Sequence, residues 1–275
     1  MNDSQNQSAG WQLDRHGPAA YEEYLVPAIF ESWAERLVDR VAIQSDDRVL
    51  DVACGTGIVS RCAATRLDTD GVVVGLDVNE GMLEVASSAV TGVQPRIEWR
   101  RGDATELPFP DEHFDVVCCQ QALQFFEDPA VALDEMCRVL EPGGRLGVSV
   151  WRPLSFNPAY VVLADALERY VGDEAATMMR SPFPPWNDDD LRSFASTANF
   201  SEVSIAIEIG SVRYPSVSAF VRQEAASSPL ADSLSDLAQE DQEAIVQDVR
   251  EALEAYVDDE GIVFPMESYV LTAVR

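Results

Sequence analysis

The chain has 275 residues, of which 47% are hydrophobic, so it is long enough for one large α/β domain with a substantial core. Its net charge is −29, and all 19 of its basic residues are arginine. The lack of lysine excludes a Walker A phosphate loop and Schiff-base chemistry, and without a basic field we expect no nucleic-acid partner. Self-repulsion of so many carboxylates is screened in molar salt, so the composition predicts a halophilic protein.

No run of 18 or more apolar residues could span a membrane, and residues 1–10 lack the layout of a signal peptide. We therefore predict a cytoplasmic protein with no membrane partner. The cysteines fall in predicted helices and strands without the paired spacing of a metal site, so we expect buried thiols and no metal. They are Cys54, Cys62, Cys118, Cys119 and Cys137.

Apolar residues recur at helical spacing over residues 18–41. The pattern predicts one amphipathic helix or two end to end, and Pro27 can open the second at its first turn. We interpret residues 1–40 as an N-terminal helical cap.

The chain is organised around residues 49–57, V-L-D-V-A-C-G-T-G, in which an apolar strand runs into a Gly-x-Gly turn and then a helix over residues 58–67. A dinucleotide fingerprint would have a third glycine, but Ser60 holds that place. Asp51 lies four residues before Gly55, where a carboxylate would repel a phosphate. A ligand with a cationic end suits this turn better.

This stretch resembles motif I of the Rossmann-like S-adenosylmethionine-dependent methyltransferases, whose pattern is close to V-L-D-x-x-C-G-T-G. The similarity is to the ubiquinone/menaquinone-biosynthesis type (methyltransferase type 11) and to the glycine N-methyltransferase-like group, and it is tight over roughly residues 41–152. It implies S-adenosylmethionine as cofactor, a ligand with an ammonium, a sulfonium and no phosphate. The implied fold is α/β, with a seven-stranded, mostly parallel sheet whose last strand is antiparallel, and with helices on both faces.

The second predicted strand covers residues 72–77 and ends in Asp77. An acid at the carboxyl end of this strand is placed to accept both hydroxyls of a ribose, although a strand-end Asp can also be a helix N-cap. A helix follows from Glu80, and in the resembled family the residue matching Met82 packs against adenine.

A third strand is predicted over residues 96–100, before the segment G-D-A-T-E-L-P-F at 102–109. In the resembled family the acid matching Asp103 accepts from the exocyclic amine of adenine, and the residue matching Ala104 donates a backbone amide. His113 lies in the exposed turn into a fourth strand over residues 116–119.

Polar residues leave the carboxyl end of the fourth strand, where ligands bind in open parallel sheets. We expect Gln120 to approach the cofactor, and Gln121 and Gln124 to face the methyl acceptor. Quinone enzymes of the family carry an Arg-Asn pair in place of Gln120-Gln121, a departure that counts against quinone ring methylation. His16 is the candidate general base, with surface or packing as its alternative role.

The remaining pattern alternates helices with strands. Helices are predicted from Pro129, over 158–170, from Asn187 to 198, and over 216–256 with a loop near 227–229. Strands are predicted over 146–151, 203–209 and 266–274. Turns or loops are predicted at 141–145 and 182–186. We divide the chain into the cap at 1–40, the cofactor-binding core at 41–152 and a C-terminal part at 153–275. Its helical insertions at about 153–200 and 216–260 are predicted to form a lid, or alternatively a dimer interface.

The predicted function is S-adenosylmethionine-dependent methyl transfer to a small-molecule acceptor at O, N or C, by in-line displacement. A non-catalytic S-adenosylmethionine-binding protein is the alternative, and a nucleotide-dependent oxidoreductase is disfavoured by Asp51. Tyr21 is assigned to the methionine end of the cofactor. The whole expected cofactor set is Tyr21, Asp51, Ala53, Gly55, Thr56, Gly57, Asp77, Val78, Met82, Gly102, Asp103, Ala104 and Gln120.

Overall fold

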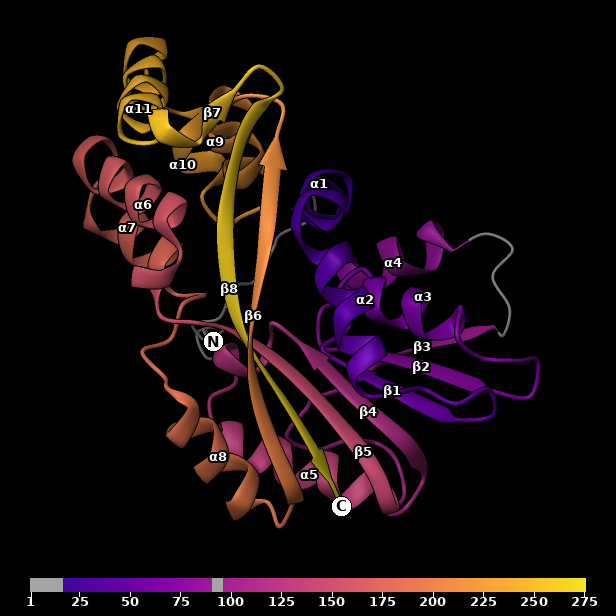
Figure 1. Cartoon of the computed structure of the whole chain (residues 1–275). Helices are drawn as coiled ribbons and strands as arrows, with labels where there is room; N and C mark the ends of the chain where they lie inside the picture. Colours follow the sequence, from indigo (N-terminus) through magenta and orange to yellow (C-terminus); the bar gives the residue numbers. More distant parts are fainter. Residues whose placement is uncertain (1–16, 91–95) are drawn as a thin grey trace, which may run out of the picture.

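The computed structural model describes residues 17–90 and 96–275 as an α/β molecule built on one twisted sheet (Figure 1). The strand order is β3-β2-β1-β4-β5-β8-β6, with β7 paired to β8. The strands are β1 (Arg48–Val52), β2 (Val72–Asp77), β3 (Ile97–Arg101), β4 (Phe114–Gln120), β5 (Leu140–Trp151), β6 (Ser201–Tyr214), β7 (Val257–Asp258) and β8 (Gly261–Val274).

The first five strands are parallel, and their carboxyl ends lie along one edge of the sheet. Asp51 of β1 pairs with Gly75 of β2 on one side and with Cys118 of β4 on the other. The strand order reverses direction between β1 and β4, which creates a crevice beyond the carboxyl ends of these two strands. The polar residues at or near the ends of β1, β2 and β4, namely Asp51, Asp77 and Gln120, therefore lie along the same edge of the sheet.

Helices cover both faces of the sheet, which confirms the predicted fold class. On one face, α2 (Glu31–Arg40) and α3 (Ile58–Ala64) pack on alternate residues of the central strands such as Val49 and Val73. On the other face, α5 (Pro129–Val139) and α8 (Asp188–Thr197) pack on the intervening residues such as Leu50 and Val74. Because successive side chains of a strand point to opposite faces, the unbroken apolar runs are buried on both sides. The fifth core helix, α4 (Glu80–Ala89), follows β2.

The far side of the sheet contains one strand more than expected, because the two-residue β7 pairs with the start of β8. The long strand β8 is antiparallel to both β5 and β6, so the prediction of an antiparallel last strand is confirmed. β6 and β8 have 14 residues each and extend well beyond the core sheet (Figure 1). The sequence pattern predicted residues 203–209 of β6 and 266–274 of β8, but not residues 210–214 and 261–265, where the two strands pair with each other beyond the core sheet.

The helical leader is one continuous structure, and the prediction that Pro27 opens its second helix is wrong. It runs through α1 (Gly17–Ala20), the π-helix η1 (Tyr21–Phe30) and α2, with Pro27 inside η1. The amide of Glu31 donates to the carbonyl of Val26, five residues earlier. This wider turn accommodates a proline ring that would clash with the carbonyl four residues back in an α-helix.

The expected turn at residues 141–145 is instead a bulge within β5, which begins at Leu140. Phe114 pairs with Leu140 and Val116 with Arg145, so four residues of β5 bulge out between the two pairs. Gly143 adopts a φ of +82°, and its amide donates to the carbonyl of the last residue, Arg275. β5 therefore begins at Leu140 and not at the predicted residue 146, because the hydrogen bond to Arg275 holds the bulged segment beside the sheet.

A second group of helices surrounds the extended ends of β6 and β8 (Figure 1). We call it the upper helical group; it comprises α6 (Pro158–Tyr170), α7 (Asp173–Arg180), α9 (Val217–Ala226), α10 (Ala231–Ser235) and α11 (Gln239–Ala252). α7 had no counterpart in the sequence pattern, whereas α6 and α8 begin at the predicted residues. α8 lies apart from this group, against α5.

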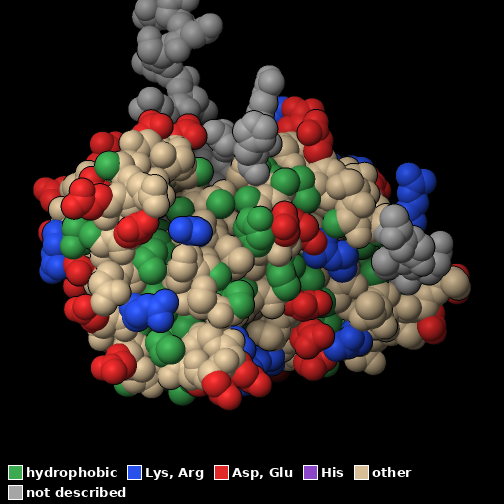
Figure 2. Space-filling model, turned by 90° about the horizontal axis from the view of Figure 1, so that it is seen from above, with side chains coloured by type: hydrophobic (Ala, Val, Ile, Leu, Met, Phe, Trp, Pro, Cys, Tyr) green, Lys and Arg blue, Asp and Glu red, His purple; other side chains and the backbone are tan. Residues whose placement is uncertain are grey.

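Acidic side chains are spread over the face of the molecule that includes the upper helical group, with arginines interspersed among them (Figure 2). Four of the five cysteines are buried and Cys62 is half-buried, as expected for free thiols. Within residues 17–90 and 96–275, no helix is long and apolar enough to cross a bilayer.

Candidate functional site

The turn between β1 and α3 has a backbone that only a few residue types adopt. Ala53, Gly55 and Gly57 have φ angles of +54°, +55° and +84°. A Cβ atom on Gly57 would lie 2.3 Å from the ring of Trp99, so this glycine is required by space as well as by conformation. The positive φ of Ala53 is strained for a residue with a side chain, as is common next to ligand sites.

Asp51 is 1% exposed, and its side chain faces the first turn of α3. Its Oδ2 accepts hydrogen bonds from the amide of Ser60 at 2.9 Å and from the hydroxyl of Ser60 at 2.6 Å. Burial raises the pKa of Asp51 to about 7, against the lowering effect of these hydrogen bonds. Ser60 therefore orients the carboxylate of Asp51. The sequence showed only that Ser60 stands where a dinucleotide fingerprint has its third glycine, and it did not indicate this role.

Asp77 lies at the end of β2 beside the same turn. One of its carboxylate oxygens accepts from the amide of Gly55 and the other from the amide of Asn79, each at 2.8 Å. The side chain of Asn79, not that of Asp77, caps α4 by accepting from the amides of Gly81 and Met82. Burial raises the pKa of the Asp77 carboxyl above its usual value. Asp77 thus joins the glycine turn instead of serving as a helix cap.

Asp51 and the glycine turn line a small pocket at the carboxyl ends of β1 and β4, and Asp77 is bonded to Gly55 of this lining. The hydroxyl of Thr56 and the amide oxygen of Gln120 are buried there without a hydrogen-bond donor or acceptor among the described residues. Tyr21 of η1 closes one side, with its ring stacked on Phe30 at a centroid distance of 4.9 Å. The lining residues are Tyr21, Asp51, Ala53, Cys54, Gly55, Thr56, Ile58, Val59 and Gln120.

The three glutamines after β4 separate into two environments. Gln120 lines the pocket and donates through Nε2 to the carbonyl of Phe30 at 3.2 Å. Gln121 has a φ of +52° and is buried toward β8, where its Nε2 donates to the hydroxyl of Ser268 at 3.0 Å. Gln124 is half-buried and donates to the carbonyl of Gln121. Gln121 and Gln124 do not line this pocket, and His16 lies outside the described residues.

The expected adenine-side residues lie next to Asp77 but outside the lining of this pocket. The amide of Gly102 donates to the carbonyl of Asp77, which joins the end of β3 to the end of β2. Ala104 and Met82 are buried, whereas Val78 is 50% exposed. The exposed Asp103 accepts from the amide and the hydroxyl of Thr105, and so forms its own local turn. This strip continues the pocket along the edge of the sheet.

An arginine that the sequence did not single out ties the leader to the glycine turn. Arg61 of α3 donates to the carbonyl of Thr56 at 2.7 Å and to the carboxylate of Glu22 at 2.8 Å. Its guanidinium thereby holds the start of η1, and with it Tyr21, over the pocket. No local signal marks this contact, because the two partners are 39 residues apart.

The residues present fit S-adenosylmethionine. Asp51 and Asp77 are buried carboxylates that form no ion pair with any described arginine, and Thr56 and Gln120 present unused polar atoms to the same pocket. A buried carboxylate without a cation is costly, so a ligand with a positively charged end and sugar hydroxyls would complete this donor and acceptor set. A pyrophosphate would meet two carboxylates here.

Known methyltransferases resemble this chain in sequence. A family model described as a methyltransferase domain matches residues 50–148. The chain is 32% identical over 186 residues to 2-phytyl-1,4-naphtoquinone methyltransferase from Synechococcus elongatus, covering 65% of this chain and 76% of that protein. It is 35% identical over 182 residues to demethylmenaquinone methyltransferase from Renibacterium salmoninarum, covering 62% and 74%.

Solved structures share the fold at lower identity. Phosphoethanolamine N-methyltransferase 2 from Haemonchus contortus, in complex with S-adenosyl-L-methionine, has a TM-score of 0.60 and 19% identity, covering 95% of this chain and 57% of that one. A SAM-dependent methyltransferase from Aquifex aeolicus has a TM-score of 0.51 and 20% identity, covering 73% and 94%. Together with the sequence relatives, the glycine turn and the strand order identify the chain as a member of the Rossmann-like S-adenosylmethionine-dependent methyltransferases, in the ubiquinone/menaquinone-biosynthesis family.

Proposed function

We propose that the pocket beyond β1 and β4 holds S-adenosylmethionine and that the methyl acceptor approaches it from the side of Tyr21 and the upper helical group. The reaction is methyl transfer from S-adenosylmethionine to a small molecule, the activity of the family. The observation that carries the assignment of the pocket is the pair of buried carboxylates, Asp51 and Asp77, that no described arginine neutralises.

Bound S-adenosylmethionine supplies a methyl carbon already activated by positive sulfur. The chain contributes binding and alignment: Asp51 attracts the cationic methionine end, and Asp77 accepts from the ribose hydroxyls. Met82, Asp103 and Ala104 border the adenine. Tyr21 and its stacked partner Phe30 exclude water from the reacting end. Asp51 must be ionised to attract a cation, so burial makes cofactor affinity fall as the pH drops below about 7.

The acceptor is expected to differ from the quinones named for the relatives. Gln121 occupies part of the position of the family's Arg-Asn pair, and its side chain is bound to Ser268 on β8. Gln121 carries no positive charge and its Nε2 is engaged by Ser268, so it does not replace the cationic donor of an arginine. We also expect a cytoplasmic protein without a nucleic-acid partner, since its net charge of −29 would repel phosphates.

The test is a calorimetric titration of the purified protein with S-adenosylmethionine, S-adenosylhomocysteine and NAD in molar potassium chloride. The first two should bind at micromolar concentration and NAD should not bind. In Asp77→Ala, affinity for both adenosyl ligands should fall roughly hundredfold or more, because two hydrogen bonds to a charged group are lost.

The matched control is Asp70→Ala. Asp70 is exposed in the turn that precedes β2, at the opposite end of the same strand, so this variant should bind like the parent protein. Undiminished affinity in Asp77→Ala, or binding of NAD alone, would contradict the proposed site.

A further inference from the structure

Four carboxylate side chains are buried among the described residues: Asp47, Asp51, Asp77 and Glu224. Asp47 forms an ion pair with Arg145 at 2.6 Å. Asp51 lines the cofactor pocket described above, and Asp77 is bonded to the amide of Gly55 in that lining. Glu224, which is 2% exposed, has neither an arginine partner among the described residues nor a place in that pocket.

Glu224 lies on α9, and both of its hydrogen bonds go to one oxygen. Its Oε1 accepts from the hydroxyls of Tyr160 and Tyr214, each at 2.6 Å. No described residue donates to its Oε2. One oxygen of this carboxylate therefore accepts two hydrogen bonds, and the other accepts none from the residues that the structure describes, although apolar side chains pack around the cluster.

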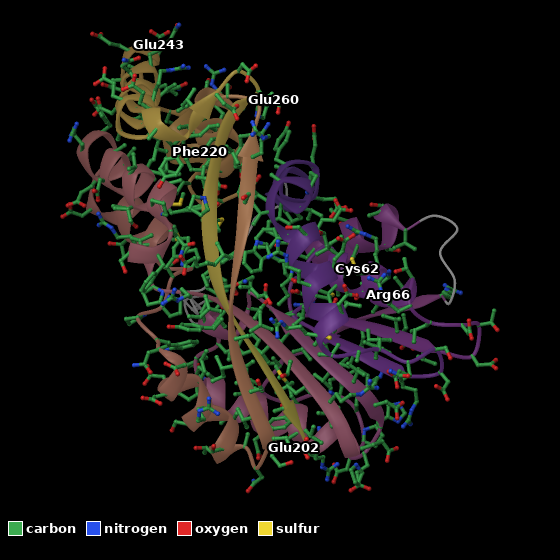
Figure 3. The ribbon with its side chains drawn as sticks, viewed as in Figure 1. Cys62, Arg66, Glu202, Phe220, Glu243 and Glu260 are labelled. Carbon is green, nitrogen blue, oxygen red and sulfur yellow. The ribbon has the colours of Figure 1, made fainter. Side chains whose placement is uncertain are left out.

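Aromatic rings surround this carboxylate. Tyr160 contacts Phe183 and Phe220 at centroid distances of 5.0 and 5.8 Å, and Tyr214 contacts Phe220 at 5.2 Å; Phe264 lies 5.0 Å from Phe220. Phe220 lies inside the upper helical group beside β8, whereas Glu243 lies at its outer end (Figure 3). A carboxylate among aromatic faces is the combination that binds an organic ammonium, through charge and cation–π attraction together.

The Glu224 cluster is connected to the cofactor pocket through Tyr21. Burial raises the pKa of the Tyr21 hydroxyl, and the nearby charges of Glu22, Asp77, Glu224 and Asp51 raise it further. The charges of Asp77, Asp51 and Glu224 therefore all act on the hydroxyl of Tyr21.

A chain of aromatic contacts also links the two places. Tyr21 stacks on Phe30, which lies 6.3 Å from Trp151, and Trp151 lies 6.4 Å from Phe183, the neighbour of Tyr160. This chain of aromatic rings thus extends from Tyr21 at the cofactor pocket to Tyr160, which donates a hydrogen bond to Glu224.

The energetic argument favours a ligand over a purely structural role. Burial raises the pKa of Glu224 to about 7, although both tyrosine hydrogen bonds act to lower it. A buried carboxylate that lacks a cation destabilises the fold relative to an apolar or amide side chain of similar size. A cation bound beside Oε2 would offset this cost, as Arg145 does for Asp47.

We propose that Glu224, supported by Tyr160 and Tyr214, is the specificity-determining anchor of the acceptor site and binds a protonated amine of the methyl acceptor. The inference rests on the proposed function, since it assigns the acceptor of the same reaction. It names an amine-bearing small molecule as the substrate class, in place of a neutral quinone.

The experiment compares two probes of the same shape, 2-phenylethylamine and 2-phenylethanol, by titration into protein saturated with S-adenosylhomocysteine at pH 8. The parent protein should bind the amine at least tenfold more tightly than the alcohol. In Glu224→Gln, whose amide oxygen can still accept from both tyrosines, this preference should fall to twofold or less. Glu243→Gln, an exposed change in the same helical group, should keep the full preference.

Tyr160→Phe serves as a second variant, because it removes one hydrogen bond and leaves the charge. It should keep a preference of at least fivefold. Equal binding of amine and alcohol to the parent protein would overturn the inference by itself, even if Glu224→Gln did not fold. A preference that survives in folded Glu224→Gln would assign Glu224 to fold stability alone and would also overturn it. Binding of S-adenosylhomocysteine, measured first, separates these outcomes from failure of the proposed function.

Discussion

Asp51 shows how one side chain can serve ligand binding at the expense of stability. It is buried between β1 and α3, held by both donors of Ser60, and has no ion-pair partner among the described residues. Its folded-state pKa of about 7 lies above the ordinary value, so the ionised form is disfavoured by the fold. The stability associated with Asp51 is therefore fully present below about pH 4 and is lost as the pH rises through about 7.

At the residue scale we predict that Asp51→Asn stabilises the protein without ligand and weakens cofactor binding. The free energy of unfolding at pH 8 should rise by about 2–4 kcal/mol, because raising the pKa of Asp51 to about 7 costs roughly 4 kcal/mol at most. The gain should be small at pH 4, where Asp51 is protonated in both states. Denaturant unfolding at the two pH values measures it.

The control is Asp47→Asn, which removes the partner of Arg145 and should destabilise the protein at pH 8. A gain for Asp51→Asn that is equal at pH 4 and pH 8 would show that the carboxylate charge is not its cause. Affinity for S-adenosylmethionine should fall at least about tenfold at pH 8, through loss of a charged contact.

At the scale of elements, η1 places an aromatic residue over the cofactor pocket. A ten-residue π-helix is rare, and here it accommodates Pro27 while directing Tyr21 inward. The contact of Arg61 with Glu22 and Thr56 fixes this helix relative to the glycine turn. The leader therefore forms part of the site as well as packing on the sheet.

We predict that Tyr21→Ala weakens binding of S-adenosylmethionine by roughly tenfold, since a half-buried ring that lines the pocket and excludes water is lost. Tyr24→Ala is the matched control, because Tyr24 lies on the same helix and does not line the pocket; it should change affinity by less than about twofold. If both substitutions lowered the affinity for S-adenosylmethionine equally, the effect would come from the stability of η1 and not from the ring of Tyr21. Calorimetry on both variants decides.

At the scale of the whole molecule, the main feature that affects stability is the large negative charge. A net charge of −29 on 275 residues creates self-repulsion that the arginine ion pairs offset only locally. Many of these pairs join distant parts of the chain, such as Arg48 to Asp115 and Glu141, but they are half-exposed and each contributes little. Screening by salt should therefore control the stability of the fold.

We predict that the unfolding midpoint rises by about 10 °C or more as potassium chloride increases from 0.02 to 0.5 M, because the Debye length shrinks from roughly 20 Å to about 4 Å over this range. Thermal scans monitored by circular dichroism measure it. An equal osmolality of sucrose is the control, since it has no charge to screen. A midpoint that does not depend on salt would contradict both this account and a halophilic origin.

The sequence by itself determined the core from β1 to β5, because buried parallel strands are read from unbroken apolar runs and glycine turns from residue type. It also placed Asp51, Gly55, Thr56 and Gln120, since the carboxyl ends of adjacent strands meet at one edge. The family and its cofactor followed from the same short stretch.

Only the tertiary structure decided the contacts between residues far apart in the chain. Arg61 with Glu22 and Gln121 with Ser268 have no local pattern, because each pair is formed by packing of separate elements. The same holds for Glu224, which shares the buried face of α9 with Val217 and Phe220, but whose partners no local pattern identifies. Its burial depends on two tyrosines from α6 and the end of β6, and no periodicity within α9 records where these lie.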